Sequence, residues 1–393
     1  MDTKLVGGIL LIVGTAIGGG MLALPIATSQ VGFFDSSLLL FACWLVMTLS
    51  AFLILEVNLW LPSNSNMISM AKATLGTTGQ IIAWLSYLLL LYSLVSAYIA
   101  GGSDFLRNLL SIAGVNLSGR LTSVIFTLLL GYIVYLGIRS VDYVNRALMI
   151  TKFGALILLI AFIMPHVTFA HLAGGQFKYL TGSITVAITS FGFATIVPSL
   201  RTYFQGDVAK LHKAILIGSL IPLVCYIFWD LAIMGVIPRD GENGLVSMLH
   251  SNRSTSEFVN ALSNLLQRDT ITVIARVFTS ICLATSFLGV SLGLSDFLAD
   301  GLQIEKKGRG NLIIYGATFL PPLLIVLFYP GAFISALSYA GIYCIVLLAL
   351  LPALMAWWGR YRRNIAKGYQ VFGGKPLLLI IILASLFIIG QSF

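Results

Sequence analysis

The sequence predicts an all-α polytopic membrane protein, and three observations lead to that prediction. Of the 393 residues, 58% are hydrophobic and 9% are charged, whereas about a quarter of the residues in soluble domains carry a charge. The apolar residues form successive runs of about 20 residues, the length of helix that crosses the hydrocarbon core. These runs are continuous and do not alternate every second residue. Helices rather than a closed barrel are therefore expected.

We expect eleven transmembrane helices in one domain that covers residues 1–393. Their approximate bounds are 4–30, 36–60, 80–105, 119–138, 145–165, 180–204, 210–237, 269–298, 311–329, 332–358 and 374–391. The polar stretch 60–79 is expected to hold a short helix. The longest loop, 238–268, is expected to hold a surface helix over residues 254–266.

The distribution of basic residues predicts the orientation. With the N-terminus inside, segments on the inner side hold sixteen lysines and arginines, and segments on the outer side hold six. Basic residues favour the cytoplasmic side of a membrane. We therefore expect the N-terminus in the cytoplasm and the C-terminus in the periplasm. The net charge of +9 is explained in the same way. Since no basic stripe with interleaved aromatic residues is present, the lipid bilayer is an expected partner and nucleic acid is not.

Catalytic and metal-binding patterns are not expected to function here. The four cysteines lie singly inside apolar runs, and the four histidines are scattered in or beside loops. The string from Gly289 to Gly293 matches the GxSxG pattern of hydrolases, but it lies within a membrane helix and not on a strand–turn–helix elbow. We expect no catalytic residue, metal or cofactor, and hence no enzyme. A channel would need a pore lined by repeated polar positions, and the sequence shows none.

Two expected spans contain residues that an uninterrupted helix avoids. The first span contains Gly19 six residues before Pro25, and the sixth contains Gly192 six residues before Pro198. Glycine weakens a helix interior, and proline removes one of its hydrogen bonds. Either glycine set alone is also compatible with close packing between membrane helices.

The two interruptions correspond if the chain consists of two five-helix halves, because they fall in spans one and six. Such a pair indicates the substrate site of an inverted-repeat transporter. Free N–H groups at a half-helix start favour a carboxylate, and free carbonyls favour an ammonium. We thus expect an amino acid bound by backbone groups around Thr15, Ala16, Gly18, Gly19, Gly20, Thr189, Ser190, Phe191, Gly192 and Phe193. A Gly192→Val substitution is expected to prevent close approach of the backbone.

Aromatic side chains near the interruptions are candidates for selecting the substrate side chain. Phe191 and Phe193 flank the second interruption and are the first choice. Tyr92 in span three and Tyr339 or Tyr343 in span ten are weaker candidates. Most other aromatic residues are consistent with interfacial belts or packing.

Three charged residues within the spans admit two interpretations each. Lys152 either extends to the inner interface or has a depressed pKa in a low-dielectric cavity and exchanges protons. Glu56 is either a salt-bridged interfacial carboxylate or part of the proton path. Arg276 either extends to the outer interface or pairs with Asp104 or Asp230.

Three segments carry a resemblance to a known family. GTAIGGGMLALPIA (residues 14–27), SFGFATIVPSL (190–200) and FLGVSLGLSDFLADGL (287–302) resemble the first, sixth and eighth helices of the hydroxy/aromatic amino acid permeases. The best-known members are the bacterial tyrosine and tryptophan permeases. Family members often carry histidine after the SFGF string, where this chain has Ala194.

The resemblance implies the five-plus-five inverted-repeat fold of the amino acid–polyamine–organocation superfamily. Repeat one then covers about 4–165, repeat two about 180–358, and an extra helix follows at about 374–391. It also implies proton symport of an aromatic amino acid across the bacterial inner membrane by alternating access, with tyrosine favoured over tryptophan. The Lys152 ammonium would occupy the place of a sodium ion in sodium-coupled relatives, near Thr285 and Ser286. The alternative is a sodium-coupled or non-aromatic neutral amino acid transporter of the same fold.

Overall fold

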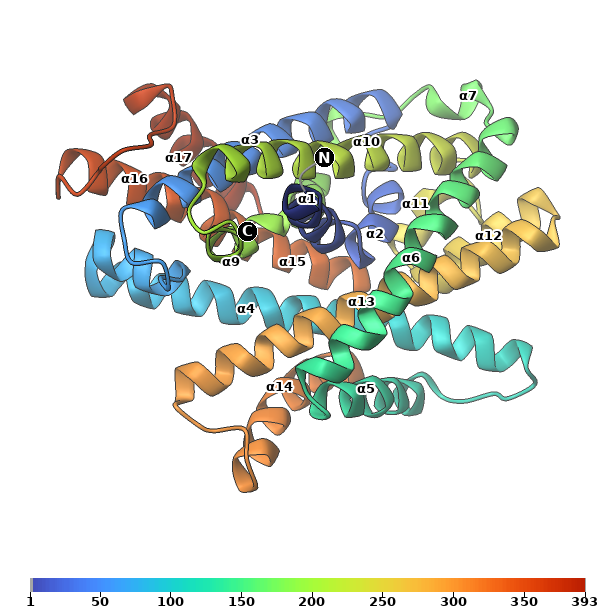
Figure 1. Cartoon of the computed structure of the whole chain (residues 1–393). Coiled ribbons are helices and arrows are strands. Elements are labelled where there is room, and N and C mark those ends of the chain that lie inside the picture. Colours follow the sequence, from blue (N-terminus) through green and yellow to red (C-terminus); the bar gives the residue numbers. More distant parts are fainter. Residues whose placement is uncertain (1–2, 393) are drawn as a thin grey trace.

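The computed structural model describes residues 3–392, except for the side chains of residues 138 and 139. Within that range the chain forms helices and loops and no strand. Figure 1 shows long helices crossing the molecule, with α3 and α10 on one side and α4 and α13 below them. The two short helices α1 (Thr3–Ala16) and α2 (Gly19–Ala27) lie between these long helices.

The described residues contain nine helical stretches that are long and apolar enough to cross a membrane. They are α3 (Phe33–Leu59), α4 (Met67–Ile112), Ser140–His166 with most of α6 (Ile138–Ile163), Phe177–Tyr203, α10 (Val208–Val236), α13 (Asp269–Leu302), α14 (Arg309–Phe328), Phe333–Tyr361 and α17 (Gly374–Gln391). The helices α1 and α2 pass the same test only as a pair, which is bent by 51°. The apolar helix α5 (Gly119–Tyr135) has 17 residues and is shorter than these. The chain is therefore a multi-pass membrane protein, and each of the eleven expected spans contains helix.

The polar segment before α4 shows how local sequence sets a helix start. The Asn66 side chain accepts hydrogen bonds from the N–H groups of Ile68 and Ser69, and the Ser69 hydroxyl accepts one from Asn66 N–H. This reciprocal capping fixes the first turn of α4. Gly76 then interrupts the helix with a φ of 79°, a value that favours glycine. The short helix expected within residues 60–79 is thus the first part of α4.

The sixth expected span is not one continuous helix. It consists of α8 (Leu180–Ser190), a 3₁₀ turn (Gly192–Ile196) and α9 (Val197–Tyr203). Pro198 lies at the start of α9. The first N–H groups of a helix have no intrahelical partner, so the missing N–H of proline costs no hydrogen bond there. The tenth expected span also changes geometry, from α15 (Phe333–Ile345) through a π turn (Val346–Leu350) to α16 (Leu351–Tyr361).

Short helices cover the ends of the bundle. They are α7 (Phe169–Leu172), α11 (Leu245–Leu249), α12 (Ser254–Leu266) and the 3₁₀ turns Met164–His166 and Phe177–Tyr179. The bounds of α12 coincide with the predicted surface helix.

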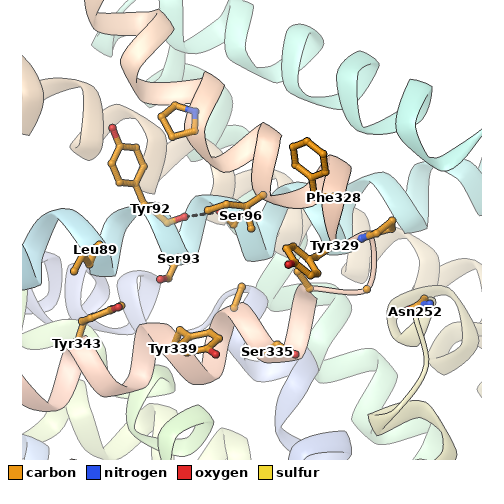
Figure 2. Close-up of a pocket in the computed structure, with 16 residues that line it drawn as sticks. Leu89, Tyr92, Ser93, Ser96, Asn252, Phe328, Tyr329, Ser335, Tyr339 and Tyr343 are labelled. Carbon is orange, nitrogen blue, oxygen red and sulfur yellow. Dashed lines mark hydrogen bonds between the residues drawn. The ribbon is translucent and has the colours of Figure 1, made fainter. Parts of the chain in front are cut away.

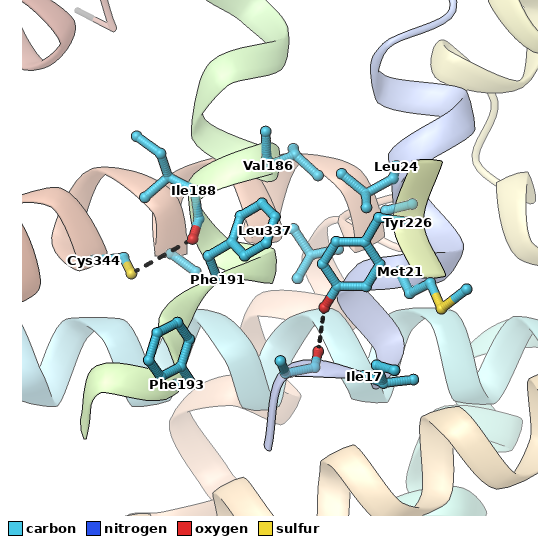
Figure 3. Packing of buried hydrophobic residues seen from close by; sticks show 14 of the residues in the cluster. Ile17, Met21, Leu24, Val186, Ile188, Phe191, Phe193, Tyr226, Leu337 and Cys344 are labelled. Carbon is cyan, nitrogen blue, oxygen red and sulfur yellow. Dashed lines mark hydrogen bonds between the residues drawn. The ribbon is translucent and has the colours of Figure 1, made fainter. Parts of the chain in front are cut away.

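The centre of the bundle is formed by the interrupted segments. All nine residues of α2 are buried, and α2 packs against α8 and α10. Figure 3 shows Ile17, Met21 and Leu24 of the first segment close to Phe191 and Tyr226. The interrupted helices are therefore enclosed by protein, which is where irregular backbone can exist at membrane depth.

Glu56 forms a buried ion pair at one end of α3. Its carboxylate accepts a hydrogen bond from Arg360 Nε at 2.7 Å and another from the Val371 N–H at 2.7 Å. The side chains of Glu56 and Arg360 are 0% and 5% exposed. The salt-bridged interpretation of Glu56 is the one the structure favours. A role of Glu56 in proton coupling stays a prediction.

Removing one partner of this pair is expected to destabilise the fold. Glu56→Gln should lower the free energy of unfolding by about 3 kcal/mol, because the Arg360 charge stays buried without its counter-ion. Thermal unfolding of the detergent-purified protein, followed by fluorescence, measures the change. The exposed pair of Arg146 and Asp142 provides a matched control, and Asp142→Asn should change stability little. Equal effects of the two substitutions would contradict the assignment.

Candidate functional site

The opening between α1 and α2 exposes backbone groups to side chains from other helices. Lys152 on α6 donates a hydrogen bond from its Nζ to the carbonyl oxygen of Ile17 at 2.7 Å. The Lys152 side chain is 1% exposed. The ammonium therefore lies inside the bundle beside the first interruption, and the interpretation that it extends to the interface is wrong.

Tyr226 on α10 connects the two interrupted segments. Its hydroxyl lies 2.7 Å from the Ala16 carbonyl oxygen and 2.9 Å from the Ser190 carbonyl oxygen, and it donates its proton between them. These two carbonyls belong to the last residues of α1 and α8. The ends of both half-helices are thus held by one hydroxyl group, which is 0% exposed. Tyr226 is not marked as a site residue by any pattern in the sequence.

Ser286 on α13 binds the start of α2. Its hydroxyl oxygen accepts a hydrogen bond from the Gly19 N–H at 2.9 Å. The neighbouring Thr285 hydroxyl instead donates to the Ile281 carbonyl of its own helix at 2.8 Å. Of these two predicted residues, Ser286 therefore reaches the interruption by a hydrogen bond and Thr285 satisfies its own helix.

A cavity of about 130 Å³ lies between the interrupted segments and α4. It brings together eight predicted site residues: Thr15, Ala16, Gly18, Gly20, Thr189, Ser190, Gly192 and Ser286. The other lining residues are Tyr87, Leu90, Leu91, Leu94, Tyr98, Thr195, Val290 and Cys344. No lining residue in the described part of the chain carries a formal charge. A zwitterion in this cavity would therefore meet backbone groups and hydroxyls.

The two phenylalanines expected to select the substrate side chain do not line this cavity. Phe191 and Phe193 are both 0% exposed. The Phe191 ring packs edge-on against Tyr226 with a centroid distance of 5.2 Å, and Figure 3 shows both rings within the hydrophobic core. The 3₁₀ turn that begins at Gly192 changes the direction in which successive side chains point. A role of these two residues in selecting the substrate side chain stays a prediction.

Tyr92 and Tyr339 line a second, larger cavity of about 860 Å³ between α4, α14 and α15 (Figure 2). Tyr343 lies there too, and the Tyr92 hydroxyl donates to the Ala317 carbonyl at 2.8 Å. None of the three lines the cavity at the interruptions. Their place in the substrate site stays a prediction. Tyr87 and Tyr98, which the sequence analysis missed, are the tyrosines of α4 in the smaller cavity.

The glycines of the two interruptions differ in how closely other groups approach them. A methyl group at Gly18 would collide with the Ser286 hydroxyl, and one at Gly20 would come within 3.1 Å of the Ser190 hydroxyl. A methyl group at Gly192 would meet the Cys344 sulfur at 3.7 Å, an ordinary contact distance. Close approach is thus required at Gly18, and the same expectation for Gly192 is not supported by this structure.

Metal chemistry has no visible support in the described residues. Within that part of the chain, no three His, Cys, Asp or Glu side chains gather to form a metal site. The arrangement that remains is a small cavity with an uncharged lining at the ends of opened helices, and a buried lysine that binds the backbone of the first interruption.

Comparison with known proteins shows the family of this chain. A model of the tryptophan/tyrosine permease family matches residues 1–391. The chain belongs to this family. Its relatives in the family include a "Tyrosine-specific transport system 2" of Haemophilus influenzae, which is 35% identical over 100% of this chain and 97% of the relative.

Two further relatives of this permease differ in the substrate that their names state. A "Tryptophan-specific transport protein" of Haemophilus influenzae is 35% identical over 97% of this chain and 93% of the relative. A "Glutamine transporter 2" of Aliivibrio fischeri is 30% identical over 90% of this chain and 89% of the relative. These three relatives are thus named as transport proteins, and their names include both aromatic and non-aromatic amino acids.

The glycine geometry predicts a contrast between two equivalent substitutions. Gly18→Ala should lower the uptake rate by about tenfold or more, because the added methyl group displaces Ser286 from the Gly19 N–H. Gly192→Ala should leave uptake within about twofold of the unsubstituted protein, since its contact with Cys344 is unstrained. Initial uptake rates, corrected for the amount of protein in the membrane, measure both. Stronger inhibition by Gly192→Ala would contradict the geometry.

Proposed function

We propose that this permease imports an aromatic amino acid by proton symport with alternating access, and that tyrosine is its preferred substrate. The hydrogen bonds that hold the opened backbone between α1 and α2 carry the proposal, because they create a binding cavity at that point. Relatives named for tyrosine and tryptophan transport support the substrate class. Tyrosine is favoured over tryptophan on overall likeness.

The proposed architecture has eleven transmembrane helices. The bent pair α1–α2 and the segment α8–α9 are the interrupted helices one and six, and α5 is the fourth, short span. Repeat one covers about 4–165 and repeat two about 180–358, and α17 is the added helix. Basic residues concentrate on one side, which supports a cytoplasmic N-terminus, a periplasmic C-terminus and residence in the bacterial inner membrane.

The substrate carboxylate is proposed to bind at the start of α2. The positive end of this helix dipole points into the cavity, and Gly18 and Gly20 leave room for close approach. The ammonium is proposed to lie near the ends of α1 and α8, beside Ala16 and Ser190. Tyr226 already donates to both of these carbonyls. Each carbonyl oxygen has a second lone pair, which remains for the substrate.

The aromatic ring requires the cavity to enlarge. Its volume is about 130 Å³, whereas an engineered cavity that binds benzene, a ring smaller than a whole aromatic amino acid, has about 150 Å³. With the N-terminus inside, Tyr87, Thr195 and Val290 lie on the cytoplasmic side of the interruptions. We infer that the ring occupies space between Tyr87 and Tyr98 of α4. This space opens when transmembrane helices one, two, six and seven rock against the remaining helices.

A second candidate substrate is a smaller neutral amino acid. The small cavity favours it, and one protein to which this chain is 30% identical is named as a glutamine transporter. This candidate shares the fold and the backbone recognition of the first. Competition between amino acids distinguishes the two.

Lys152 is proposed to couple transport to protons. Its ammonium binds the Ile17 carbonyl inside the bundle. This is the place that we assign to the sodium ion of sodium-coupled relatives. Loss of the proton removes the charge and weakens this bond, so protonation controls the geometry of the interruption. Sodium is not required in this arrangement.

Uptake into proteoliposomes tests the proposed function. Labelled tyrosine should accumulate when the outside is acidic, and tryptophan and phenylalanine should compete more strongly than glutamine or leucine. An imposed sodium gradient at equal pH should produce no accumulation. Accumulation driven by sodium, or competition mainly by glutamine, would contradict the proposal and favour the second candidate.

Substitution of the lysine tests the coupling. Lys152→Ala should reduce proton-driven accumulation at least about tenfold, because the charge that responds to the proton gradient is gone. Counterflow, which exchanges labelled for unlabelled substrate without a gradient, should persist if the fold is intact. Lys178 lies in the Phe177–Tyr179 turn, outside the cavity. Lys178→Ala serves as the control and should retain accumulation. Full accumulation by Lys152→Ala would rule out the assigned role.

A further inference from the structure

A second buried titratable group, on α10, takes no part in the cavity. The Asp230 side chain is 0% exposed and lies within the last two turns of α10, which ends at Val236. Neither carboxyl oxygen has a hydrogen-bond partner in the described part of the chain. An ionised carboxylate buried in this way is strongly unfavourable, so the neutral acid is the form that fits this structure.

Thr28, at the end of α2, is within interaction range of Asp230. Its hydroxyl already donates to the Leu24 carbonyl at 2.7 Å. The lone pairs that remain on the Thr28 oxygen can accept a proton but cannot stabilise a negative charge. While the Thr28 hydroxyl donates to Leu24, a protonated Asp230 can donate to Thr28, whereas an ionised Asp230 could be bound only if the Thr28 hydroxyl turned away from Leu24.

The end of α10 is covered by segments from the ends of the bundle. The Trp229 ring packs against Phe258 of α12 and Phe278 of α13, with centroid distances of 5.9 and 5.4 Å. The Gly235 carbonyl accepts a hydrogen bond from Thr168 N–H at 2.8 Å and lies 3.2 Å from a His171 ring nitrogen. The Trp229 indole nitrogen is also buried and unpartnered. This end of the molecule is therefore closed over polar groups that water would satisfy if it opened.

Other charged groups do not neutralise Asp230. The elements packed against α10 are α1, α2, α3, α6, α7 and the turn Met164–His166, and Trp229 adds α12 and α13. Their acidic, basic and histidine side chains include Lys4, Asp35, Glu56, Asp142, Arg146, Lys152, His166, His171, Glu257, Asp269, Arg276, Asp296 and Asp300. Asp230 forms no hydrogen bond or ion pair with any of these described side chains. The pairing of Arg276 with Asp104 or Asp230, which the sequence left open, is likewise not formed.

We propose that Asp230 is a proton-binding group of the transport cycle, protonated while this end of the bundle is closed and ionised when it opens to water. On closing, the carboxylate takes a proton from hydronium and leaves water; on opening, the O–H bond breaks and the proton returns to water. The inference rests on the proposed function and adds a second titrating group to Lys152. With the N-terminus inside, this end faces the periplasm, so external protons favour closure.

Asp230→Asn tests the proposal, because the amide is a neutral group of the same shape. The measurement is tyrosine counterflow at equal pH on both sides of the proteoliposome membrane, repeated over a range of pH. The unsubstituted protein should show a rate that changes by up to about tenfold per pH unit, as one titrating group allows. Asp230→Asn should depend on pH more weakly than the unsubstituted protein, because only the contribution of Lys152 remains, and Asp230→Glu should restore the stronger dependence.

Asp104→Asn is the matched control. Asp104 lies on α4 and accepts hydrogen bonds from the Ser256 N–H and hydroxyl at 2.8 and 2.9 Å, so its charge is already satisfied. This variant should keep the pH profile of the unsubstituted protein, and thermal unfolding confirms that each variant is folded.

The outcomes separate this inference from the proposed function. A pH-dependent counterflow that is unchanged in Asp230→Asn overturns the role of Asp230, as does a flat profile in the unsubstituted protein. Failure of a pH gradient to drive net uptake overturns proton symport. Counterflow moves no net substrate and needs no pH gradient. It therefore still tests the role of Asp230 if proton symport is overturned.

Discussion

The hydrogen bonds to the opened backbone between α1 and α2 are the interactions on which the rest of the structure depends. A membrane helix that stops at mid-span leaves polar groups that lipid cannot satisfy. Lys152, Tyr226 and Ser286 supply partners from α6, α10 and α13. Three helices that are distant in sequence must therefore pack around one short break. Tyr226 binds the end of α8 as well, so the two interruptions are fixed relative to each other.

In this arrangement the buried charged side chains are not among the residues that line the cavity. The lining of the cavity consists of backbone, hydroxyl and apolar groups, whereas the buried pair of Glu56 and Arg360 lies at the end of α3 and serves stability. Lys152 and Asp230 are buried and lack a carboxylate or ammonium partner in the described residues. Groups of this kind respond to protons, while the cavity itself needs no formal charge to bind a zwitterion.

The position of the site could be predicted from the sequence, because glycine and proline mark interrupted helices directly. Lys152 could be predicted as well, since a lysine in an apolar span is conspicuous. Tyr226 could not, because it stands in the apolar run CYIFWD and only tertiary packing brings its hydroxyl to Ala16 and Ser190. The sequence does not give the direction of side chains at an interruption, and the buried rings of Phe191 and Phe193 do not line the cavity. Tyr92 and Tyr339 were assigned by span alone, and spans three and ten border two cavities.

The most direct measurement of the central claim is the binding of substrate analogues to the purified permease, by isothermal titration calorimetry. The claim is that backbone groups at the ends of α1, α2 and α8 bind both charged groups of an amino acid. Tyrosine should bind, and tyramine, which lacks the carboxylate, and N-acetyltyrosine, which lacks the ammonium, should each bind at least about a hundredfold more weakly. Binding of either analogue as tight as that of tyrosine would show that the interrupted helices are not the recognition site.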